Sequence, residues 1–291
     1  MMFNRSKLRC AWLVLVLLSC ALVEARQSQV AVGTPQGSLA VATQVNAPTN
    51  SITYVGNSGF LIRVGDKKVL VDAVFEGFPG SYAPPASVQD LVLNGRAPFD
   101  NIDLMLATHS HADHFTPAAV SRSLQSNPRA VFVGPPDTVA QVTGAAGRAT
   151  ALDVPDGQRR TLQVNGMSID AMPLSHGTPP PGQPGLVNLA YVVTVGGMTF
   201  LHTGDIDASI IGHEALRTLV APGDRIDVAF VAHFLLSTPG PLPLVTQGIH
   251  ARFVVASHLQ YTDRPPDFAQ IRRNFPDAVL LKTEMESWAI R

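Results

Sequence analysis

The sequence has little cysteine, and both of its cysteines lie near the beginning. Among 291 residues only Cys10 and Cys20 carry a thiol. Beyond residue 20 the chain therefore offers no disulfide and no thiolate ligand for a metal. A domain of this length buries enough apolar surface to be stable without a disulfide. Any metal site in the rest of the chain is expected to use histidine and carboxylate side chains.

Charged residues are also scarce, at 15% of the chain, and neither sign dominates. Three of the 21 basic residues and one of the 22 acidic residues lie in residues 1–25, which leaves 18 basic and 21 acidic residues and a net charge of about −3. A weakly acidic chain lacks the positive surface that nucleic-acid-binding proteins present to phosphates. We therefore expect no nucleic-acid partner.

The first 25 residues predict an export signal. An apolar stretch from Cys10 to Leu22 is too short for a comfortable membrane span and is followed by the small-x-small cleavage sequence Val23-Glu24-Ala25. Basic residues precede it: Arg5, Lys7 and Arg9. We expect residues 1–25 to be a signal peptide and the protein to be secreted or periplasmic. Leu17-Leu18-Ser19-Cys20 also resembles a bacterial lipoprotein box, so a lipid anchor at Cys20 is one alternative and an uncleaved anchor is another.

After the signal, residues 26–50 are rich in Gln, Ser, Thr, Gly and Ala, which predicts a flexible leader. Residues 51–291 are expected to form one domain. Its first three β-type runs are separated by short turn sequences at residues 56–59 and 65–66, which predicts an antiparallel meander. Gly and Pro punctuate residues 75–98 and 178–185, and we expect both segments to form loops that wall a pocket.

The most informative segment is Thr-His-Ser-His-Ala-Asp-His at residues 108–114, directly after an apolar run. Alternate residues of an extended segment face the same way, so His109 and His111 can reach one ion. The turn at Ala112 then directs Asp113 and His114 toward a second ion. Imidazole and carboxylate favour zinc, with iron and manganese as alternatives. A His-rich tag is the simpler interpretation, but tags are terminal and polar, whereas this segment lies mid-chain behind an apolar strand.

Three polar residues further along the chain also follow apolar runs: His176, Asp205 and His258. Strands end and loops begin at such positions, which is where sites are usually built.

The segment at residues 108–114 resembles the signature of the metallo-β-lactamase superfamily, and the resemblance extends from about Ser51 onward. Residues 53–62 also resemble the opening hairpin of the branch that contains ascorbate-6-phosphate lactonases and N-acyl-phosphatidylethanolamine phospholipases D. The resemblance implies an α/β (α+β) fold, a four-layer αββα sandwich with two divalent metal ions at its edge. It implies a bridging role for Asp205. It implies one ion held by His109, His111 and His176, and one held by Asp113, His114 and His258.

The same resemblance implies a metal-dependent hydrolase, in which a metal-bridging hydroxide attacks a lactone, phosphodiester or other ester-like bond. Asp205 favours the lactonases, phosphodiesterases and thioesterases, because the true β-lactamases of the superfamily generally have Cys or Ser at this position. Three alternatives stay open: hydrolysis of β-lactams, metal binding without turnover, and a mono-iron sulfur oxygenase.

Other residues are assigned supporting roles. Asp113 is expected to orient the nucleophile as well as bind metal, and His233 to contact the substrate or donate a proton, a role that suits the pKa of imidazole. Tyr261 is an alternative donor. Asp72, at the end of the third β-type run, is expected to support the ligands from behind, as in the family. The apolar, Pro-rich pocket walls favour a small or lipid-like substrate.

Overall fold

Neighbouring side chains in the early strands belong to two different apolar clusters. In β3 (Lys67–Val71), Val69 and Val71 pack in a cluster shared with the second half of the chain, whereas Leu70 packs in a separate cluster. Successive side chains of a strand point to opposite faces of its sheet. Both faces of this sheet are therefore buried.

The computed structural model describes residues 49–77, 82–178, 185–209, 211, 216, 225–260 and 265–291. Residues Asn46–Arg291 form one compact unit. The predicted signal peptide, residues 26–48 of the predicted leader, most of the predicted Pro-rich loop after His176, and Tyr261 lie outside the described residues. Within the described ranges no helix is long and apolar enough to cross a membrane.

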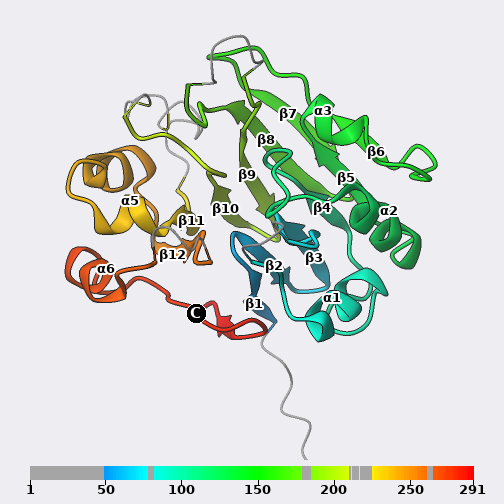
Figure 1. The fold of residues 1–291 in the computed structure, drawn as a ribbon, viewed down its shortest axis with the longest axis horizontal. Helices are drawn as coiled ribbons and strands as arrows, with labels where there is room; N and C mark the ends of the chain where they lie inside the picture. The colour runs from blue at the N-terminus through cyan, green and yellow to red at the C-terminus, as the bar shows by residue number, and fades with distance from the viewer. Residues whose placement is uncertain are drawn as a thin grey trace, which may run out of the picture. The chain divides into compact units, whose positions relative to one another are not determined.

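The first sheet has seven strands in the order β13-β1-β2-β3-β4-β5-β6 (Figure 1). Strands β1, β2 and β3 form the predicted antiparallel meander, and β3, β4, β5 and β6 run parallel to one another. Besides β3, its strands are β1 (Asn50–Gly56), β2 (Gly59–Val64), β4 (Leu104–Leu106), β5 (Val131–Gly134), β6 (Ala149–Ala151) and β13 (Ser287–Ala289).

The second sheet has six strands in the order β12-β11-β10-β9-β8-β7. The pairs from β7 to β10 are antiparallel, and β10, β11 and β12 are parallel. The strands are β7 (Arg160–Val164), β8 (Met167–Pro173), β9 (Leu189–Val195), β10 (Met198–His202), β11 (Val228–Ala232) and β12 (Phe253–Ser257).

Helices cover the outer face of each sheet, with α1, α2 and α3 on one side and α5 and α6 on the other (Figure 1). Val88 and Leu124, from the first group, pack under the first sheet, and Leu235 and Ile271, from the second group, join the central cluster. The helices are α1 (Ala86–Leu93), α2 (Pro117–Ser126), α3 (Pro136–Val139), α5 (His233–Ser237), the π-helix η1 (Leu244–Ile249) and α6 (Phe268–Asn274). The predicted αββα sandwich is confirmed.

Helix α1 corrects the prediction that residues 75–98 are a loop throughout. Val88 and Val92 are four residues apart, so they share one helical face, and both are buried against the first sheet. The Gly and Pro residues of this segment flank the helix and do not interrupt it.

Four strands end one to three residues before a candidate ligand. The seven-residue motif follows β4, His176 follows β8, Asp205 follows β10, and His258 follows β12. β8, β10 and β12 point in the same direction within their sheet, so their ends meet at one edge. This edge brings together side chains that are far apart in the sequence.

Candidate metal centre

Asp205 lies at the middle of a cluster of histidines. Its Oδ2 atom lies close to four Nε2 atoms: 2.9 Å from His258, 3.3 Å from His114, 3.7 Å from His176 and 4.0 Å from His109. A carboxylate has two oxygens and can serve two ions, which an imidazole cannot. The position of Asp205 suits the bridging role that the resemblance implies.

The seven predicted ligands fall into three overlapping groups, and within each group the ligand atoms lie within 4.8 Å of one another. Two of these groups are the two predicted ligand sets, one for each ion. The third group contains Asp205 and one histidine from each of those sets. The groups are His109, His111 and His176; Asp113, His114 and His258; and His109, His114 and Asp205. The structure thus brings every predicted ligand into one place.

Several polar atoms of this cluster are buried without a hydrogen bond to any described residue. They are Nε2 of His109, His114 and His176, and Oδ1 of Asp205. Buried polar atoms nearly always have a partner, so a convergent set of unpartnered atoms indicates a site built to bind a ligand. Imidazole nitrogens and a carboxylate oxygen are the donor set that zinc and related divalent ions take. The residues present therefore fit a metal.

Asp72 supports two of the histidine ligands on the side away from the cluster, one directly and one through Thr108. Its fully buried carboxylate accepts hydrogen bonds of 2.8 Å from the backbone N–H and the hydroxyl of Thr108, and lies 2.8 Å from Nδ1 of His114. The Thr108 hydroxyl also lies 2.9 Å from Nδ1 of His109. Because each Nδ1 is engaged on the outer side, each Nε2 faces the cluster.

The electrostatics of the cluster favour the proton-free form of His109, His111 and Asp205, whereas His114 keeps its proton. Burial lowers the pKa of His109 and His111, so both rings are neutral near pH 7. Burial opposes ionisation of Asp205, but His114 and His258 hold its pKa well below the usual range. Burial likewise opposes protonation of His114, but Asp205 and Asp72 raise its pKa. Since a bound divalent ion would replace that proton, metal binding is expected to release it.

Three residues of the site have left-handed backbone: Asn57 (φ +46°), Asp72 (φ +47°) and His258 (φ +57°). Non-glycine residues in this region are uncommon and cluster at functional sites. Gly204, before Asp205, has φ +60°, and a Cβ atom there would overlap the side chain of Asn188. The packing around the cluster therefore fixes the backbone as well as the side chains.

Two buried residues fix the turn that carries Asp205. Asn188 accepts a hydrogen bond from the backbone N–H of Asp205 at 3.2 Å and donates to the carbonyl of Leu174 at 3.3 Å. The N–H of Gly204 donates to Nδ1 of His202 at 3.1 Å, which leaves Nε2 to donate to the carbonyl of Ser58 at 3.0 Å. Nothing in the sequence around Asn188 indicated this role.

His233 begins α5 and is buried, with an exposed fraction of 2%. It belongs to none of the metal-capable groups among the described residues. The next residue, Phe234, has its ring 5.9 Å from the ring of His258. The ring of His233 lies 5.6 Å from that of Phe234, and its role as a proton donor or substrate contact stays a prediction.

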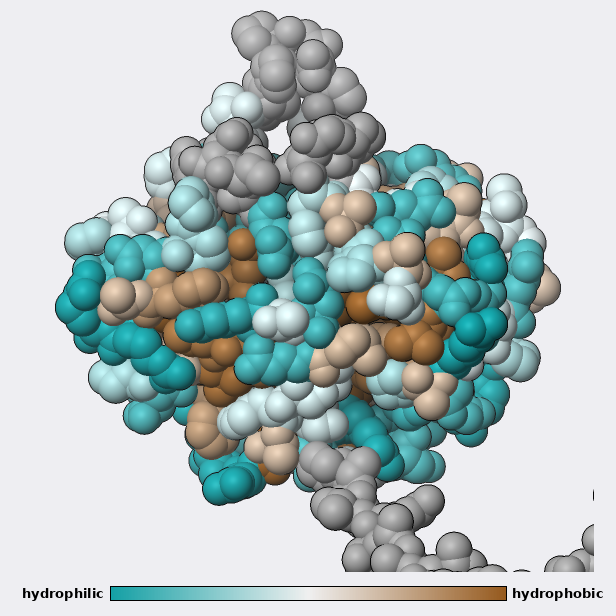
Figure 2. All heavy atoms as spheres, turned by 60° about the horizontal axis from the view of Figure 1, so that its bottom comes forward, coloured by the Kyte–Doolittle hydropathy of each residue, from teal (hydrophilic) through white to brown (hydrophobic). Residues whose placement is uncertain are grey.

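A cleft of about 650 Å³ adjoins His176 and includes the residues on either side of it, Ser175 and Gly177. Apolar side chains line much of it: Leu152, Val154, Met172, Leu174, Leu186, Val187 and Ile211. Val187 is the one large apolar residue that is exposed in the described part of the chain, at 39%. On the face shown in Figure 2, apolar atoms are likewise visible mainly in hollows between hydrophilic residues.

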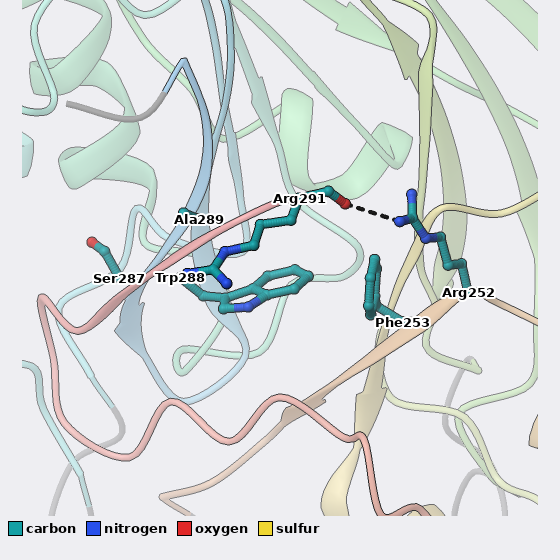
Figure 3. Close-up of a pocket in the computed structure, with 6 residues that line it drawn as sticks. All are labelled: Arg252, Phe253, Ser287, Trp288, Ala289 and Arg291. Carbon is teal, nitrogen blue, oxygen red and sulfur yellow. Dashed lines mark hydrogen bonds between the residues drawn. The ribbon is translucent and has the colours of Figure 1, made fainter. Parts of the chain in front are cut away.

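A second pocket, of about 390 Å³, is lined by residues of β13, by Arg291 and by the start of β12, and it contains none of the candidate ligands (Figure 3). Phe253 and Trp288 meet edge to face with ring centroids 5.0 Å apart. Arg252 lies over the Phe253 ring and donates a 3.0 Å hydrogen bond to the carbonyl of Arg291. These contacts join the two sheets, so we interpret this pocket as a structural joint.

Comparisons with known proteins agree with the fold. A family model described as the β-lactamase superfamily domain matches residues 51–256. A UPF0173 metal-dependent hydrolase of Thermococcus kodakarensis is 27% identical over 239 residues, which cover 80% of this chain and 94% of the relative.

Solved structures show the same architecture. A metallo hydrolase of Ignicoccus hospitalis, Igni18, has a TM-score of 0.59 at 16% identity and covers 83% of this chain and 99% of its own. An isothiocyanate hydrolase from Delia radicum gut bacteria has a TM-score of 0.55 at 17% identity and covers 82% of this chain and 98% of its own. At these identities the likeness concerns the fold alone.

Proposed function

The chain belongs to the metallo-β-lactamase superfamily, and from that premise we propose that it is an exported dinuclear metal-dependent hydrolase that cleaves a lactone, phosphodiester or other ester-like bond. The observation that carries the proposal is the position of Asp205. Its carboxylate lies within 4.0 Å of four imidazole Nε2 atoms, and three of these four make no hydrogen bond to a described residue.

The ligand groups support two ions. His109, His111 and His176 would hold one, Asp113, His114 and His258 the other, and Asp205 would reach both. Two divalent ions, with zinc favoured and iron or manganese as alternatives, would supply Lewis acidity and a water molecule with a lowered pKa.

The chain's own residues would orient the reacting water molecule and determine the side from which a substrate approaches. Asp113 has a side chain that is 14% exposed, on the accessible side of the cluster, where it can orient a water molecule and accept its proton. His176 is also partly exposed, at 25%, whereas His109 and His114 are buried. A substrate would therefore approach past His176 and Asp113.

The cleft beside His176 supports a small or lipid-like substrate. Its apolar lining can hold the non-reacting part of an acyl or alkyl group next to the cluster. Lys, Arg and His are absent from its lining among the described residues, which disfavours polyanions such as nucleic acid. Asp205 itself disfavours β-lactams, because the true β-lactamases of the superfamily generally have Cys or Ser at this position.

The experiment combines metal analysis with a substrate screen. We expect two ions per chain and turnover of at least one lactone, phosphodiester or thioester, but not of β-lactams. Asp113→Ala is expected to abolish turnover, and Asp100→Ala, which changes a surface carboxylate paired with Lys68, is the control. Equal rates for the wild type and Asp113→Ala on every substrate would leave a metal-binding protein without hydrolysis. A single iron per chain would favour the sulfur oxygenase.

Export is tested separately, by the mass of the protein recovered from cells that make the full chain. Cleavage after Ala25 supports a secreted or periplasmic enzyme, and incorporation of a labelled fatty acid that Cys20→Ala abolishes supports a lipoprotein. A full-length protein in the soluble cell fraction contradicts export.

A further inference from the structure

We propose that Asn57 is a positioning residue for one of the two metal sites, because its side chain holds Asp113 and the loop of His258 in a fixed relation. This inference rests on the proposed function, since it assigns a role within the dinuclear centre. Asn57 lies in the turn between β1 and β2, and its exposed fraction is 1%.

Asn57 contacts two loops that come from different sheets. Its Nδ2 donates a 2.8 Å hydrogen bond to Oδ2 of Asp113, in the loop after β4. Its Oδ1 accepts from the N–H of Gln260 at 3.3 Å, and its backbone carbonyl accepts from the N–H of Leu259 at 3.3 Å. Leu259 and Gln260 directly follow His258, so one side chain spans the sandwich edge between two predicted ligands.

The orientation of the amide follows from its partners. A backbone N–H can only donate, so the amide oxygen must face Gln260 and the amide nitrogen must face Asp113. The donated hydrogen bond occupies one lone pair of Oδ2 and leaves the others for an ion. Being neutral, the amide fixes the carboxylate without the repulsion that a lysine or arginine would exert on a cation.

The contacts of Asn57 single out one ligand group. Asp113 and His258 belong together with His114, and Oδ2 of Asp113 lies 3.7 Å from Nε2 of His258. The hydrogen bonds of the Asn57 side chain among the described residues reach Asp113 and Gln260. The group of His109, His111 and His176 is held by other contacts, notably that of Thr108 with His109.

The left-handed backbone of Asn57 (φ +46°) allows its side chain to be tested apart from its conformation. Glycine adopts this region without strain, so Asn57→Gly removes the amide and keeps the turn. Asn101 offers a matched control, because it has φ +55° and its Nδ2 donates a 2.8 Å hydrogen bond to an aspartate, Asp100. Neither residue belongs to the cluster. Asn101→Gly therefore removes the same kind of contact in the same kind of backbone.

The experiment titrates zinc into the metal-free full chain by calorimetry, with the wild type, Asn57→Gly and Asn101→Gly compared. We expect two binding steps in the wild type, with one step weakened about 10- to 100-fold in Asn57→Gly, the range typical when a residue supporting a ligand is removed. The other step and both steps of Asn101→Gly are expected to keep wild-type affinity. Asn57→Ser, whose shorter side chain cannot span both loops, serves if the glycine variant does not fold.

Two results overturn the role of Asn57: wild-type affinity at both steps, or equal weakening of both steps, which marks a general structural effect. A wild type that binds one ion instead refutes the dinuclear proposal. In that case the proposed role of Asn57 is refuted if Asn57→Gly binds its one zinc ion with the affinity of the wild type.

Discussion

Asp72→Asn tests how a supporting carboxylate contributes to the candidate centre, because it removes a charge and keeps the size of the side chain and the backbone conformation. Asparagine tolerates the left-handed conformation that Asp72 adopts at φ +47°. Asp72 belongs to none of the metal-capable groups among the described residues. It acts through His114, whose Nδ1 lies 2.8 Å from Oδ2 of Asp72.

The expected effect follows from the proton on that imidazole. With aspartate, Nδ1 of His114 donates outward and Nε2 presents a lone pair to the cluster. The N–H of Thr108 donates to Oδ1 of Asp72 at 2.8 Å and would hold the oxygen of an asparagine in that place, which turns the new NH₂ group toward His114. The ring would then accept at Nδ1 and carry its proton on Nε2, the atom that an ion needs.

Metal affinity is therefore expected to fall about 10- to 100-fold, which corresponds to roughly 1.4–2.7 kcal/mol. Zinc titration of the metal-free protein measures it, with Asp100→Asn as the control for a surface carboxylate. Wild-type affinity at both sites in Asp72→Asn would refute the argument that Asp72 sets the proton position of His114.

Three further predictions concern activity, the cleft and pH. Asp205→Asn should lower kcat/KM by at least about 100-fold, since the variant loses the charge shared by both ligand groups, and a rate within a few-fold of the wild type would contradict its central role. Val187→Asp should raise KM for apolar esters about 10-fold with little change in kcat, because it removes binding common to ground and transition state, whereas an unchanged KM would mean that the cleft does not bind substrate. Lys68 lowers the pKa of Asp100 below 3.8, so Asp100 stabilises the fold above that pH and ceases to do so as the pH falls through the lowered value. Urea unfolding should therefore show Asp100→Asn less stable than the wild type at pH 7, by up to about 1 kcal/mol for a pair this exposed. The difference in stability should shrink as the pH falls below 3.8 and Asp100 takes up a proton, and a difference that does not shrink would contradict this assignment.

The convergence of the candidate ligands was predictable because the resemblance named them and each of them follows an apolar strand. His109, His176, Asp205 and His258 come just after β4, β8, β10 and β12, and strands that run in the same direction bring their ends to one edge. The meander of β1, β2 and β3 was predictable for a similar reason, since its turns are short and marked by Gly, Asn and Asp.

Supporting residues were harder to find, because their role depends on tertiary contacts. Asn57 sits in a Gly-Asn-Ser-Gly turn and has the sequence signature of a turn residue alone, although it contacts Asp113 from 56 positions away. Asn188 precedes β9 with no local pattern around it. Helix α1 was missed because its flanking Gly and Pro residues outweighed two valines at helical spacing.

The pairing of β1 with β13 has a consequence for how the chain folds during synthesis. Ser51 pairs with Ala289, and the hydroxyl groups of Thr53 and Ser287 meet at 2.7 Å across 234 positions of sequence. Until β13 has emerged from the ribosome, β1 presents an unpaired edge to which strands of other chains can add. Contacts of such long sequence separation also form late and slowly. Ribosome-bound chains that stop before β13 are therefore expected to need a chaperone to keep that edge covered.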